Sequence, residues 1–458
     1  MILASALYLF LTVVLFCLER NRTRRKGPDF LSLFVVIFAV QNIIPGMVIS
    51  FLLSQYARPP DLQNELFDRI YQHISPIDIF LSAMMSLSFI LALYIFYHKL
   101  YSRYTQTTGD PRRTRLQVVS WRLWLVMLLG VFSSYFLLKS MGQDSLLNTY
   151  RTLVLFRAGG GVSRTFVNAN LFALAQTFSL LSIIPFVYFV IRPGGFGKFL
   201  RLVIATAGVI VFSLLCVSRR ALPLDILLIY FTLVIVNKKW YLKFAGVAFL
   251  LFLPVLIYGK AVIFSIGASG NFDGVLDAVK NTSVPDALLS GFTYLGISLV
   301  TSWATFMFLD IPFRYGIDHI LSMLGRIPLG SLGFDKDAIL PERIVRISTR
   351  TFVDSNAQDI PPGLIGQMWL DFGIFGPVIW GMIFAAALSF LQIRFERKQK
   401  TPQSVAFFMI GLYVLSLPLN TGSFDFVFSV DVFFLVLFLL IVYKRVAYRC
   451  LESEELSR

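Results

Sequence analysis

Two adjacent arginines, Arg219 and Arg220, interrupt a long apolar stretch and carry the strongest chemical signal in this sequence. The apolar segments on either side, 202–217 and 221–237, would each be about 24 Å long as helices, close to the thickness of a bilayer core. An arginine in or near hydrocarbon costs about 2.5–3.5 kcal/mol on insertion scales. We therefore interpret the pair as ligands for an anion, and a lipid-linked phosphate is the anion that fits this position.

A second cationic cluster surrounds a run of three glycines in the segment 139–165. Glycine lets backbone N–H groups approach an anion closely, and arginine presents planar, permanently charged donors that suit phosphate oxygens. The alternative is a flexible turn with solvated charges. Because the topology below puts this segment on the same face of the membrane as Arg219 and Arg220, we favour an anion site. Its members are Arg151, Arg157, Gly159, Gly160, Gly161 and Arg164.

The long segment 263–372 mixes cations, carboxylates and aromatic rings, a combination that could bind sugars. Histidine exchanges a proton readily near neutral pH, so His319 is a candidate general base, and Asp354 is an equal candidate. Arg314 and Arg343 are candidate substrate-binding cations. The alternative reading is a solvated loop with incidental ion pairs and a structural histidine.

The end of this segment predicts a short helix that breaks before the chain crosses the membrane. Pro361 and Pro362 disfavour a preceding helix, and the Gly373–Pro377 stretch predicts the break. Gln367 and Asp371 are one helical turn apart and therefore share a face. Gln367 is a candidate substrate-binding residue, although the whole element could simply be a kinked entry to a span.

Composition indicates a polytopic membrane protein. Hydrophobic residues make up 57% of the chain and the mean hydropathy is +0.73, too apolar for a soluble globule. The net charge of +15 does not indicate nucleic-acid binding, because the basic residues cluster in short loops between apolar runs. Cys17, Cys216 and Cys450 are scattered without a CxxC pair, so we expect no disulfide framework, no metal site and no cofactor.

Placing the basic loops in the cytoplasm predicts an all-α fold of about eleven transmembrane helices. The N-terminus is then periplasmic and the C-terminus cytoplasmic, and residues 1–458 form a single membrane domain. The basic loops are 20–26, 99–115, 192–201, 238–243, 394–400 and the tail from 444. The predicted spans are 2–18, 30–53, 77–97, 118–138, 166–191, 202–217, 221–237, 244–262, 373–393, 403–420 and 425–443.

Between the eighth and ninth spans lies a large external region, 263–372, with interfacial helices. Its apolar part 288–309 carries Thr293, Ser298, Thr301, Ser302 and Thr305. These hydroxyls favour a helix in the interface or along a cavity over a lipid-facing crossing.

Several of these motifs together resemble the Wzy-type oligosaccharide repeat-unit polymerases, membrane glycosyltransferases of the broader GT-C group. The resemblance rests on Arg151–Arg157 with the glycine run, Ser218-Arg219-Arg220-Ala221, Pro361–Gln367 leading to Phe372-Gly373, and the Arg314-to-Gly325 spacing. The chain departs from the family at Val217, where glycine is common, and at Gln367, where glutamate is common.

The resemblance implies an inverting, metal-independent glycosyl transfer at the periplasmic face of a bacterial inner membrane. A glycan on undecaprenyl pyrophosphate would be passed to a new lipid-linked repeat unit, and a chain-length regulator and a flippase are implied partners. Arg219 and one of Arg151 or Arg157 would bind the pyrophosphate, with Arg220 and Arg314 as supporting cations. His319 or Asp354 would be the base.

Three other functions remain open. A transferase like the O-antigen ligases would use the same arginines and usually carries a catalytic histidine in its large external loop. A lipid-oligosaccharide flippase or other transporter would need a charged path through the membrane and usually paired halves, and the sequence shows no internal repeat. A non-catalytic scaffold of a polysaccharide synthase complex is the third.

Overall fold

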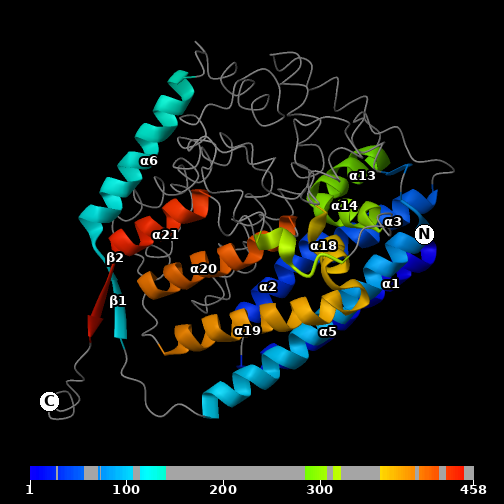
Figure 1. Cartoon of the computed structure of the whole chain (residues 1–458), viewed down its shortest axis with the longest axis horizontal. Helices are drawn as coiled ribbons and strands as arrows, with labels where there is room; N and C mark the ends of the chain where they lie inside the picture. The colour runs from blue at the N-terminus through cyan, green and yellow to red at the C-terminus, as the bar shows by residue number, and fades with distance from the viewer. Residues whose placement is uncertain are drawn as a thin grey trace.

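The computed structural model describes ten stretches of the chain, and nearly all of them are helical (Figure 1). They are residues 1–26, 29–55, 71–72, 74–106, 114–140, 284–306, 313–320, 362–397, 402–421 and 430–447. Within them, four helical segments are long and apolar enough to cross a membrane: Ile2–Thr23, Phe30–Gln55, Pro76–Arg103 and Gly363–Glu396. The predicted helical membrane fold is confirmed to that extent.

The helices follow the predicted spans closely. The first three of these apolar segments lie in α1 (Ile2–Lys26), in the run of α2 (Phe30–Phe38), η1 (Ala39–Ile43) and α3 (Ile44–Gln55), and in α5 (Pro76–Gln106). After them come α6 (Ser120–Ser140), α19 (Gly376–Glu396), α20 (Pro402–Thr421) and α21 (Val430–Val442). The predicted spans 166–191, 202–217, 221–237 and 244–262 lie outside the described residues, so the count of eleven stays a prediction.

Helices α5 and α19 lie side by side (Figure 1). A glycine allows their close approach, because a Cβ on Gly381 would lie only 2.8 Å from the Ala92 Cβ and 3.1 Å from the Phe89 carbonyl oxygen. Small residues at such a contact let helix backbones pack closely. The Phe89 and Phe384 rings lie edge to face beside it, with centroids 5.9 Å apart.

The apolar part of the predicted external region 263–372 forms two short helices. Helices α13 (Val284–Leu295) and α14 (Ile297–Thr305) are about 18 and 14 Å long and are separated by the single residue Gly296. The hydroxyl residues singled out in the sequence are all buried, and Thr301, Ser302 and Thr305 donate to carbonyl oxygens of their own helix. The interfacial placement of these helices stays a prediction.

A small β-ribbon departs from the all-α prediction. Strands β1 (Thr114–Val118) and β2 (Tyr443–Ala447) pair antiparallel, with Thr114 opposite Ala447 and Val118 opposite Tyr443. Tyrosine, threonine and valine fit a strand. The two strands are far apart in the sequence, so no local pattern predicts their pairing. The ribbon joins two segments that were predicted to share the cytoplasmic face.

Three stretches predicted as cytoplasmic loops, 20–26, 99–115 and 394–400, contain the last turns of α1, α5 and α19, because these helices run further than predicted. These helix ends lie at one end of the bundle, here called the basic end (Figure 1). Tyr97 Oη donates to Asp29 at 2.9 Å and Tyr101 Oη to Glu396 at 2.7 Å, which ties these helix ends together. The N-terminus, α13, α14 and α18 (Gly363–Phe372) lie toward the other end, here called the opposite end (Figure 1).

Candidate functional site

Three of the predicted site residues, His319, Arg314 and Gln367, fall within the described residues, and they lie in one cluster at the opposite end. The other predicted site residues lie outside the described residues: Arg151, Arg157, Gly159, Gly160, Gly161, Arg164, Arg219, Arg220, Arg343 and Asp354. The cluster is built on two elements, the segment 313–320 and the α18–η3–α19 break.

The break forms where the glycines and proline predicted it. Helix α18 ends at Phe372, η3 covers Gly373–Phe375, and α19 starts at Gly376 with Pro377 in its first turn. Gly373 has φ = 56°, a left-handed conformation that glycine adopts without strain. The turn holds the end of α18 against the segment 313–320.

Helix α18 is positioned by its close contact with α14. Gly363 has φ = 72°, and a Cβ there would lie 1.7 Å from the Ser298 carbonyl oxygen. A Cβ on Gly366 would lie 3.0 Å from the Thr305 Cβ and 3.1 Å from the Ser302 Cα. The two glycines thus permit the close approach of α18 to α14, and this contact fixes the face of α18 that carries Gln367 and Asp371.

The segment 313–320 pairs with the end of α18 through backbone hydrogen bonds. Arg314 N donates to the Leu370 carbonyl at 2.8 Å, and Tyr315 N donates to the Asp371 carbonyl at 3.0 Å. The chain then turns sharply at Tyr315 (φ = 49°) and Gly316 (φ = 77°). Left-handed backbone at a non-glycine residue such as Tyr315 is uncommon, and here the pairing with α18 holds it.

Asp371 is the centre of the cluster. It is fully buried, and its carboxylate accepts four hydrogen bonds. Oδ1 accepts from Gln367 Nε2 at 3.0 Å and from Gly316 N at 3.1 Å. Oδ2 accepts from Trp380 Nε1 at 3.1 Å and pairs with His319 Nε2, also at 3.1 Å. These bonds compensate for burying the carboxylate and hold the His319 ring in one orientation.

Beside the His319–Asp371 pair, Arg314 and Asp318 form a bidentate ion pair. Arg314 Nε and Nη2 donate to the two carboxylate oxygens of Asp318 at 2.8 and 2.9 Å. The Asp318 side chain is 4% exposed and the Arg314 side chain 19%, so part of the guanidinium reaches the surface. The hydrogen bonds to Asp318 raise the pKa of Arg314, which therefore stays charged.

The arrangement resembles the support given to a catalytic base. A buried carboxylate that holds one nitrogen of an imidazole sets the tautomer and stabilises the imidazolium formed when the ring takes a proton. A fixed, partly exposed arginine nearby can stabilise a developing negative charge. Proton transfer next to an anion is the chemistry that this geometry allows.

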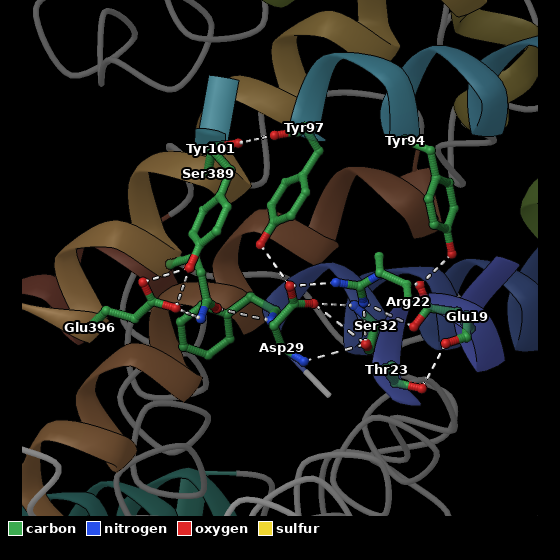
Figure 2. Close-up of polar contacts among 12 residues, drawn as sticks. Glu19, Arg22, Thr23, Asp29, Ser32, Tyr94, Tyr97, Tyr101, Ser389 and Glu396 are labelled. Carbon is green, nitrogen blue, oxygen red and sulfur yellow. Dashed lines mark hydrogen bonds and ion pairs between the residues drawn. The ribbon is translucent and has the colours of Figure 1, made fainter. Parts of the chain in front are cut away.

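A second polar cluster, at the basic end, was not expected from the sequence (Figure 2). Arg22 pairs with Glu19 at 2.9 Å and also donates to Asp29 and Ser32. The Arg22, Glu19 and Asp29 side chains are only 13–18% exposed. Glu19 and Asp29 flank the basic stretch 20–26. Acidic residues on both sides of a basic stretch could have indicated this cluster from the sequence.

Tyrosines of α5 connect this cluster to neighbouring helices (Figure 2). Tyr94 donates to Glu19, Tyr97 donates to Asp29, and Tyr101 donates to Glu396 of α19. Gln392 of α19 donates to Glu396 at 2.8 Å and accepts from Phe30 N at 3.2 Å. The cluster therefore connects α1, α2, α5 and α19 by side-chain hydrogen bonds and holds these helices together.

Comparison with known proteins finds no match for this chain: no family model, no curated protein and no solved structure is similar to it.

Proposed function

We propose that this protein is an inverting glycosyltransferase that polymerises lipid-linked oligosaccharide repeat units in a bacterial inner membrane. The observation that carries the proposal is the buried His319–Asp371 pair beside the Arg314–Asp318 pair, at the end of the bundle away from the basic loops. By the positive-inside rule that end faces the periplasm. In this orientation the N-terminus is periplasmic and the C-terminus cytoplasmic.

In the proposed reaction, a hydroxyl of the new repeat unit attacks the anomeric carbon of a glycan held on undecaprenyl pyrophosphate. The new glycosidic C–O bond forms as the C–O bond to the pyrophosphate breaks, with inversion. His319 takes the hydroxyl proton, and Asp371 acts through His319 as a positioning residue. The lipid pyrophosphate leaves as an anion, and its charge is met by Arg314 together with Arg219, Arg220 and one of Arg151 or Arg157.

The test is a gel profile of lipid-linked glycans from cells that lack the protein. The null strain is complemented with wild type, with His319→Ala, or with Cys17→Ser as a control at an exposed cysteine. We expect single repeat units in the null strain and a ladder with wild type and Cys17→Ser. His319→Ala, at equal abundance in the membrane, should leave single repeat units. A normal ladder from His319→Ala would overturn the assignment of the base.

A ligase-like transferase is the second candidate, because a buried His–Asp pair in the large external region fits that chemistry equally well. The same gels separate the two functions. A null strain that accumulates full-length polymer on its lipid carrier would place the protein after polymerisation. Repeat units that stay on the cytoplasmic side would instead favour the flippase alternative.

A further inference from the structure

In the segment 313–320 large apolar side chains are exposed and two polar ones are buried, the reverse of what is expected for a loop that faces water. Two of its charged or polar side chains, Asp318 and His319, turn inward and are only 3% and 7% exposed. Its large apolar side chains turn outward: Phe313 is 50% exposed, Tyr315 66%, Ile317 48% and Ile320 59%. In water this arrangement would leave apolar surface hydrated while placing charges inside.

The 3-10 turn η3 extends this apolar surface. Ile374 and Phe375 are each 69% exposed. The Phe313 ring covers Gly373, where a Cβ would lie 2.8 Å from Phe313 Cζ. The six exposed residues of these two adjacent elements are here called the apolar rim: Phe313, Tyr315, Ile317, Ile320, Ile374 and Phe375.

The apolar rim leads directly into the outward face of α19. Val378, Ile383 and Phe390 are 38%, 44% and 59% exposed on that helix, one or two turns apart. The other face of α19 packs against α5. Since Gly363–Glu396 is one of the segments apolar enough to cross a membrane, this outward face is the one available to lipid.

We propose that the apolar rim inserts into the bilayer, at the boundary of headgroups and acyl chains in the leaflet at the opposite end. A contiguous, strongly exposed apolar patch marks a contact surface, and its continuity with the outward face of α19 identifies lipid acyl chains as the occupant. Aromatic residues such as Tyr315 favour this depth. The inference does not depend on the reaction that the protein catalyses.

One consequence does rest on the proposed function. The Arg314–Asp318 and His319–Asp371 pairs lie directly behind the rim, so they are at the depth of lipid headgroups. A substrate anchored by its own lipid chain in that leaflet would reach them sideways without leaving the membrane.

The test is spin-label accessibility in the full-length protein reconstituted in liposomes. Single cysteines replace Tyr315, Ile317 and Phe375 in a background in which Cys17, Cys216 and Cys450 are serine. Phe390→Cys on α19 is the lipid-facing control, and Lys444→Cys, at an exposed position of β2, is the aqueous control. All five labels are probed with oxygen, which concentrates in hydrocarbon, and with a charged nickel chelate, which stays in water.

We expect the ratio of oxygen to nickel collisions at the three rim positions to approach that of Phe390→Cys and to exceed that of Lys444→Cys several-fold. A ratio like that of Lys444→Cys would mean that the rim faces water and would overturn the inference. Labels shielded from both reagents would mean that protein covers the rim, either another segment of this chain or a second copy, and would also overturn it. Since the rim residues are not part of the proposed chemistry, either result leaves the proposed function to its own test.

Discussion

At the residue scale, Asp371 decides both the stability and the chemistry of the candidate site. The Gly316 backbone N–H and the Trp380 indole N–H can only donate to its carboxylate, one to each oxygen. Gln367 donates through Nε2, and His319 can act as donor or acceptor according to its tautomer. A carboxylate, with acceptors on both oxygens, satisfies all four partners. An amide of the same size cannot, because its NH2 group would face at least one of the obligatory donors.

We therefore predict that Asp371→Asn folds but lowers the free energy of unfolding by about 1–3 kcal/mol, since one buried donor loses its acceptor. Asp371→Ala leaves the donors Gly316 N, Gln367 Nε2 and Trp380 Nε1 without an acceptor, at about 1–3 kcal/mol each, so it should cost more than Asp371→Asn. Denaturant titration of the purified protein in detergent measures both values. Ser389→Ala, which deletes a buried hydroxyl at the basic end, is the control and should cost less than about 1.5 kcal/mol. Equal costs for Asp371→Ala and Ser389→Ala would contradict the central role of Asp371.

At the element scale, the contact between α14 and α18 sets the position of Asp371. We predict that Gly363→Ala costs at least about 2 kcal/mol, because it combines a left-handed backbone with a Cβ that overlaps the Ser298 carbonyl. Thermal unfolding of detergent-solubilised protein measures the effect.

Gly411→Ala on α20 is the matched control, because its Cβ would meet only the end of the Leu391 side chain at 3.3 Å. It should leave stability nearly unchanged. If the two alanine variants unfolded at the same temperature, the close packing of α18 on α14 would be wrong.

The sequence predicted the elements that are determined by neighbouring residues, and it missed the element that depends on distant ones. Hydropathy alone located α1, α5, α19 and α20, because burial in a membrane acts on about twenty successive residues. The break at Gly373 was predicted from glycine and proline chemistry. The β1–β2 ribbon was missed because its stability comes from pairing between distant segments.

The sequence predicted individual residues of the candidate site, but not the tertiary contacts between them. His319 and Gln367 were selected by residue type, and the shared face of Gln367 and Asp371 followed from helical spacing. The pairing of His319 with Asp371, 52 positions away, is a tertiary contact with no local signal. Trp380 lies in an apolar span, where an aromatic residue is expected for packing alone, so its hydrogen bond to Asp371 was not anticipated.

At the scale of the whole molecule, the two polar clusters lie at opposite ends and are expected to respond differently to mutation. We predict that Arg22→Ala destabilises the protein by about 3–5 kcal/mol, because it leaves Glu19 and Asp29 without their cation. The exposed Arg394 is the control, and Arg394→Ala should change stability by less than about 0.5 kcal/mol. Denaturant titration compares the two variants, and equal effects would rule out a stabilising role for the polar cluster at the basic end.

The orientation of the bundle gives a further prediction. In a background without native cysteines, Gln55→Cys at the exposed end of α3 should react with a membrane-impermeant maleimide added to intact spheroplasts. Ser102→Cys, exposed on the last turns of α5 at the basic end, should react only after the membrane is permeabilised. The reverse pattern would place the His319–Asp371 pair on the cytoplasmic side and exclude a periplasmic reaction.

The most direct measurement is polymerisation by the purified protein in proteoliposomes that contain lipid-linked repeat units. We predict that wild type makes lipid-linked dimers and longer chains and releases undecaprenyl pyrophosphate in equal number to the bonds formed. His319→Ala, folded to the same extent, should lose this activity by about 100-fold or more, the usual contribution of a general base. Undiminished polymerisation by His319→Ala, or no polymerisation by folded wild-type protein, would contradict the proposed function.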